Sequence, residues 1–151
     1  MVARDSTIPY LSIAASSPSE KSNIVRDGLS TAFVKQMATD LMIDQSVLTD
    51  SMGIARSTFT RKARKQEVLS SGESAVVLGL ARIVGEIERI LTESGDPEQL
   101  KTFDLTEWVG AWLREPVAAL GGLPPLAYMD NPYGQETVLQ LVGQMQSGAF
   151  A

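Results

Sequence analysis

Residues 70–93 read SSGESAVVLGLARIVGEIERILTE, the longest stretch in which apolar residues recur every three to four positions. This spacing places them on one face of an α-helix, the face that normally packs into a core. Ser70 and Glu73 form the S-x-x-E pattern of a capping box, so we expect the helix to begin there. Proline cannot continue a helix, so Ser94–Pro97 should end it. The predicted stripe comprises Val76, Val77, Leu80, Ile83, Val84, Ile87, Ile90 and Leu91.

Shorter periodic segments surround this helix and predict an all-α fold. Ser30 is a candidate N-cap, and Asp104 with Glu107 is a candidate acidic capping pair. We expect the Gly- and Pro-rich stretch 118–132 to form an ordered turn. Gly79 and Gly85 weaken the long helix and indicate close packing there. The shorter helices are expected at about 19–28, 30–41, 44–53, 55–65, 104–115 and 135–146.

Composition restricts the possible functions. The chain has 151 residues, of which 44% are hydrophobic, enough to bury a core. It contains no cysteine and no histidine, which removes disulfides, thiol chemistry and His-based catalysis. We therefore predict no catalytic site, no metal and no cofactor. No run of 18 apolar residues and no signal-like apolar segment is present, so we expect a cytoplasmic protein without a membrane partner.

Charge divides the chain into two parts. Residues 1–65 carry nine Lys/Arg and six Asp/Glu, a net charge of +3, whereas residues 66–151 carry four and twelve, a net charge of −8. A basic part suits a polyanion, and an acidic part suits a protein partner. We expect a flexible leader over 1–18, a helix-turn-helix region over 19–68 and a second helical domain over 69–151.

The basic part contains a pattern typical of a helix-turn-helix. A short helix up to Gly53 and a basic helix after Ala55 are separated by a tight, glycine-containing break. In this motif the second helix meets bases in the major groove, and its far end meets phosphates. A solvated basic helix on a bundle is the alternative. The predicted DNA-binding residues are Arg56, Ser57, Thr58, Arg61, Lys62 and Lys65.

Two further groups of residues could carry chemistry. Trp108 and Trp112 lie one helical turn apart; a core position is favoured over an interface anchor. A group of carboxylates could suggest a metal or acid–base site, but their spacing fits no EF-hand loop, and a solvated acidic face is favoured. These carboxylates are Glu86, Glu88, Glu93, Asp96 and Glu98.

The C-terminal half resembles the toxin-binding domain of the Xre/MbcA/ParS-type antitoxins. The resemblance rests on Trp112–Leu113, Pro116, Ala119–Gly122, Pro125–Leu126, Gly134 and a late Gly148. The basic region resembles the Xre-type helix-turn-helix that precedes this domain, so the resemblance covers about residues 30–149. Asn131–Tyr133 departs from the polar, threonine-containing lead-in that is more usual before Gly134.

This resemblance implies an antitoxin of a type II toxin–antitoxin pair. Its partner would be a RES-domain toxin that consumes NAD⁺, neutralised by direct binding. The helix-turn-helix would form a homodimer, within a larger hetero-oligomer, and repress its own operon by binding promoter DNA. A stand-alone dimeric repressor, whose C-terminal half serves dimerisation or sensing, is the alternative.

The end of the chain is the predicted toxin-facing element. Phe150 follows Gly148 in a stretch too short to fold back as a helix, and exposed aromatic residues are enriched at interfaces. A frayed terminus is the alternative. The predicted toxin-binding residues are Tyr133, Val138, Leu141, Val142, Met145, Gly148 and Phe150.

Overall fold

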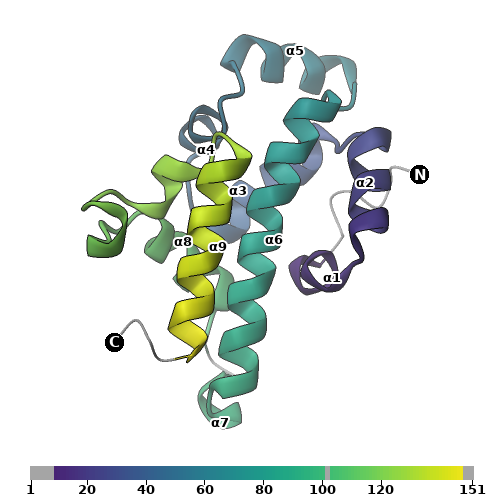
Figure 1. Cartoon of the computed structure of the whole chain (residues 1–151). Helices are drawn as coiled ribbons and strands as arrows, with labels where there is room; N and C mark the ends of the chain where they lie inside the picture. Colours follow the sequence, from purple (N-terminus) through teal and green to yellow (C-terminus); the bar gives the residue numbers. More distant parts are fainter. Residues whose placement is uncertain (1–8, 101–102, 148–151) are drawn as a thin grey trace.

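The computed structural model describes residues 9–100 and 103–147, and within these ranges the chain is helical without a β-strand (Figure 1). The all-α prediction is therefore confirmed. The α-helices are α1 (Tyr10–Ala15), α2 (Pro18–Asp27), α3 (Thr31–Leu41), α4 (Gln45–Ser51), α5 (Arg56–Lys65), α6 (Ser71–Ser94), α7 (Pro97–Leu100), α8 (Leu105–Leu113) and α9 (Pro132–Ser147). Two 3₁₀ turns, η2 (Ala118–Leu120) and η3 (Pro125–Tyr128), lie between α8 and α9.

Helix α6 forms the centre of the molecule. Helices α1 and α2 pack on one side of it, and α8 and α9 pack against it elsewhere (Figure 1). Its apolar stripe is core as predicted: Val77, Leu80, Ile83, Val84 and Ile87 are buried. Helix α3 also contacts α8, so the basic and acidic parts of the sequence share one hydrophobic core.

The predicted helix starts are confirmed by their caps. Ser70 accepts a hydrogen bond from the Glu73 N–H, and the Glu73 carboxylate accepts one from the Ser70 N–H, which completes the capping box. Ser30 caps α3 through the Phe33 N–H, and Asp104 caps α8 through the Glu107 N–H. Each cap satisfies a backbone donor that a helix leaves unpaired at its first turn.

Glycines mark the places where backbones come closest. A Cβ at Gly85 would collide with the Tyr10 carbonyl on α1, and one at Gly79 would collide with the Gln135 side chain on α9. The predicted close packing of α6 is thus confirmed. Gly110 on α8 lies against the Leu41 carbonyl in the same way, a contact that no sequence pattern predicted.

The expectation of a flexible leader is wrong for the described residues 10–15. Ile13 is 1% exposed, and Tyr10 packs edge-to-face on Phe33 with ring centroids 6.4 Å apart. The Tyr10 hydroxyl donates a hydrogen bond of 2.6 Å to Asp40. Helix α1 has six residues, too few for a periodic pattern, and its docking on α6 stabilises it instead.

The last helix begins at Pro132, three residues before the predicted start. Proline suits the first position of a helix, where its missing N–H costs nothing. The Asn131 side chain accepts a hydrogen bond of 2.9 Å from the Gly134 N–H and so caps the first turn. Residues Asn131–Tyr133, which differ from the lead-in more usual in the family, therefore form a regular helix start.

Candidate functional site

The basic helix α5 follows α4 through a tight turn at Gly53, whose φ of +74° is the left-handed conformation that glycine adopts without strain. Phe59 is buried and fixes the inner face of α5, while Ile54 is buried in the turn. The opposite face exposes Arg56, Ser57, Thr60, Arg61, Arg64 and Lys65. The structure thus gathers four of the six predicted DNA-binding residues on one accessible face.

Two arginines on this face already have acidic partners. Arg56 donates to both carboxylate oxygens of Asp50, at 2.6 and 3.2 Å, and Arg61 lies 3.0 Å from Glu67. The hydrogen bonds between Asp50 and Arg56 lower the pKa of Asp50 and raise that of Arg56. Ion pairs this exposed to solvent contribute little to stability, so a phosphate or a base can replace the carboxylate at small cost.

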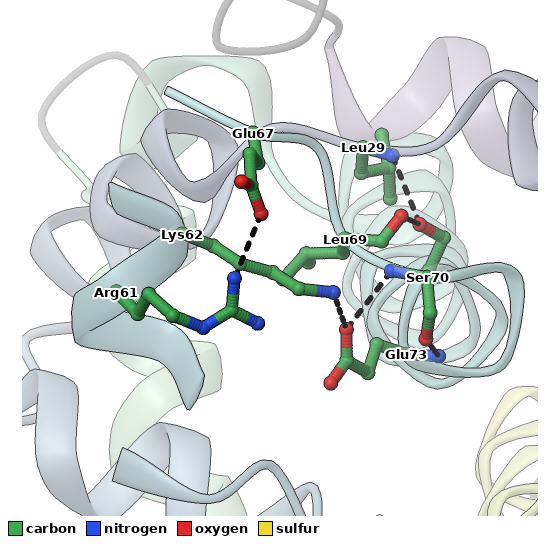
Figure 2. A network of polar contacts seen from close by, with 8 residues as sticks. Leu29, Arg61, Lys62, Glu67, Leu69, Ser70 and Glu73 are labelled. Carbon is green, nitrogen blue, oxygen red and sulfur yellow. Dashed lines mark hydrogen bonds and ion pairs between the residues drawn. The ribbon is translucent and has the colours of Figure 1, made fainter. Parts of the chain in front are cut away.

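Lys62, also a predicted DNA-binding residue, differs from its neighbours because its side chain is mostly buried and is paired with a residue of α6. Its side chain is 13% exposed, and its ammonium lies 2.9 Å from Glu73 of α6 (Figure 2). Burial alone would raise the pKa of Glu73, but hydrogen bonds from Lys62 and Ser70 outweigh it and lower that pKa. Thr58 is also partly buried. Lys62 joins α5 to the capping box of α6.

The same junction contains a buried polar contact between distant parts of the sequence. The Leu29 N–H donates to the Ser74 hydroxyl at 2.9 Å, and the Leu69 N–H donates to the Leu29 carbonyl at 2.8 Å. Ser74 is fully buried, so these bonds satisfy groups that would otherwise be costly to bury. They fix the segment between α5 and α6, and with it the orientation of α5.

A groove of about 430 Å³ lies where α8 ends and η2 begins. It is lined by Trp108, Ala111, Trp112, Glu115, Pro116, Val117 and Ala118. Both tryptophans are partly buried, with one part packed on the core and another open to the groove. The prediction that both tryptophans belong to the core is therefore only partly right, because each side chain also faces the groove. Spacing of i, i+4 cannot distinguish a residue at the centre of a core from one at its edge.

The predicted toxin-binding residues fall into three groups. Val138, Leu141 and Val142 are buried in the core against α6, so their side chains are not exposed for the toxin contact predicted from the sequence. Tyr133 is 85% exposed and Met145 is partly buried, so these two are accessible. Gly148 and Phe150 lie outside the described residues. The apolar residues predicted for α9 do lie on one face of this helix, but most of that face packs inside the core.

Within the described residues, the carboxylates that the sequence analysis singled out form no compact metal site. Arg89 pairs with Glu86 at 2.6 Å and with Glu93 at 2.9 Å on α6, and Asp96 is exposed in the turn after that helix. In the described part of the chain, no cluster of His, Cys, Asp or Glu could hold a metal ion. Across residues 9–100 and 103–147, no helix is long and apolar enough to cross a membrane.

Comparisons with known proteins agree with this architecture. Residues 80–148 match the family described as the antitoxin Xre/MbcA/ParS C-terminal toxin-binding domain. Over 142 residues, the chain is 36% identical to the "Prs ADP-ribosylating antitoxin" of Sphingobium sp. (strain YBL2). The alignment covers 94% of this chain and 87% of that protein. The chain therefore belongs to the Xre/MbcA/ParS-type antitoxins, and the groove and α9 lie in its toxin-binding domain.

Proposed function

We propose that this antitoxin neutralises a RES-type, NAD⁺-consuming toxin by binding it directly through residues 80–148. The observation that carries the proposal is the accessible tryptophan groove inside the segment that matches the toxin-binding family. Aromatic side chains are enriched where proteins bind one another. The name of the Sphingobium relative also supports the NAD⁺ chemistry, since ADP-ribosylation takes its ADP-ribose from NAD⁺.

A binding experiment with the product of a neighbouring toxin gene tests this proposal. We expect the two chains to co-purify as one complex of fixed stoichiometry, and the complex to show no NAD⁺ consumption. Truncation after Met145 and Phe150→Ala then test the contribution of the end of the chain. If neutralisation survives both changes, the toxin contact lies in the Trp108–Leu126 segment instead of the tail.

We further propose that α4 and α5 act as a helix-turn-helix that binds the promoter of the antitoxin's own operon. The exposed basic face of α5 and the tight Gly53 turn support this assignment. Arg56→Ala and Arg61→Ala should each weaken promoter binding by about 1–3 kcal/mol, the value of a lost bidentate base contact. Titration at fixed salt measures the effect, and unchanged affinity in both folded variants would contradict the assignment.

The operator-binding form is proposed to be a homodimer, since helix-turn-helix proteins usually bind two half-sites about 34–36 Å apart. The apolar residues Phe33 and Val76 do not offer a dimer surface, because Phe33 is buried and Val76 packs against the core. Met42 and Val47 beside the α3–α4 loop are exposed and offer an alternative surface. Light scattering with and without DNA measures the mass, and a strictly monomeric chain would contradict the proposal.

A further inference from the structure

We propose that the groove beside Trp108 and Trp112 binds a cationic side chain, arginine or lysine, supplied by the toxin. The inference rests on the proposed function and specifies the chemistry of the partner at one place on the interface. It follows from the identity of the lining residues and from the charge around them.

The lining of the groove combines two indole rings with one carboxylate. Trp108 and Trp112 lie on α8, and Glu115, two residues after its end, is the charged residue among those that line the groove. Among the residues that the structure describes, no cation pairs with the Glu115 carboxylate. A cation placed over an indole face is attracted by the ring electrons, and arginine also stacks on the ring while its donors reach a carboxylate.

The charge around the groove favours the same occupant. Residues 66–151 carry a net charge of −8, and Asp104 and Glu107 are exposed at the start of the same helix. Arg114, the neighbouring cation, donates its Nε–H to the Gly110 carbonyl at 3.2 Å. An anionic side chain would meet repulsion here, and a purely apolar one would cover Glu115 without offering it a partner.

Tryptophan fluorescence tests the groove without the toxin, because both tryptophans of the chain line it. We expect N-acetyl-arginine amide to change the emission in a saturable way, and N-acetyl-leucine amide to leave it unchanged. Glu115→Gln should abolish the response to the arginine probe. A saturable response to the leucine probe alone, or equal responses of the wild type and Glu115→Gln, would overturn the proposal.

A second experiment tests the groove in the complex with the toxin, by measuring how variants of the antitoxin bind it. Glu115→Gln and Trp112→Leu should each weaken toxin binding at least about tenfold by calorimetry, the effect of losing a partly desolvated charge contact. Glu107→Gln is the matched control, since it removes an equal charge from an exposed residue of α8 that does not line the groove, and its toxin affinity should stay within about twofold of the wild type. Circular dichroism checks that each variant folds.

The outcomes separate the inference from the proposed function. If the wild type binds the toxin and Glu115→Gln binds equally well, the groove does not hold a cation, although neutralisation stands. If Trp112→Leu alone weakens binding, an apolar anchor occupies the groove and the inference is wrong. If the wild type fails to bind the toxin, the proposed function fails, and the cation site proposed for that interface fails with it.

Discussion

Glu88 is a residue whose negative charge destabilises the folded state at neutral pH. It is partly buried on α6, and burial, followed by the negative charges of Asp40 and Asp104, raises its pKa. The Tyr10 hydroxyl donates to Asp40 and does not neutralise the cluster. A raised pKa means that the folded state prefers the protonated carboxyl, so the contribution of Glu88 to stability is full at low pH and is lost as the pH rises through the folded pKa.

Glu88→Gln should therefore raise the thermal midpoint at pH 7, because the amide removes the cost of a half-buried charge. The difference from the wild type should shrink towards pH 4, where Glu88 itself is protonated. Thermal unfolding followed by circular dichroism at both pH values measures this. Exposed Glu136→Gln is the control and should change neither midpoint. A stabilisation of equal size at pH 7 and pH 4 would contradict the electrostatic explanation.

At the scale of elements, the starts of the helices with a capping residue were predictable, and the packing partners of each helix were not. Ser30, Ser70 and Asp104 carry local capping signals, which the structure confirms. Helix α1 was missed because its order comes from packing on α6 rather than from its own six residues. Gly110 likewise has its meaning only in the contact with Leu41, sixty-nine positions away in the sequence.

Two glycines provide a matched test of this packing. Gly110→Ala should destabilise the fold by about 3 kcal/mol or more, because the methyl group would meet the Leu41 carbonyl and neither backbone can yield easily. Gly143→Ala on α9 has open space around the new methyl group and should gain up to about 1 kcal/mol of helix propensity. Urea unfolding measures both, and equal effects would contradict the close α3–α8 approach.

At the scale of the whole molecule, the sequence predicted two surfaces of opposite charge but not how they are joined. The Lys62–Glu73 pair and the Leu29–Ser74 hydrogen bond span 11 and 45 positions, and no local pattern indicates such contacts. The candidate toxin-binding face was only partly predictable for the same reason. Periodicity placed Val138, Leu141 and Val142 on one face of α9, and only the tertiary fold shows that this face is inside.

This arrangement predicts that the two binding functions can be separated. Arg56 and Arg61 lie on the exposed face of α5, whereas the tryptophan groove lies at the end of α8. A chain carrying both Arg56→Ala and Arg61→Ala should lose promoter binding and still neutralise the toxin. Promoter titration and toxin co-purification on the same preparation check this. Loss of both functions in a folded variant would show that the surfaces depend on one another.

The NAD⁺ level of cells that express the proposed partner, a RES-type toxin, tests the central claim most directly. Expressed alone, the toxin should deplete NAD⁺ and stop growth. Co-expression of this antitoxin from a separate, constitutive promoter should keep NAD⁺ near its normal level, since neutralisation requires only the bound complex and no repression. Depletion of NAD⁺ to the same extent with and without the antitoxin, when both proteins are present and folded, would contradict the account.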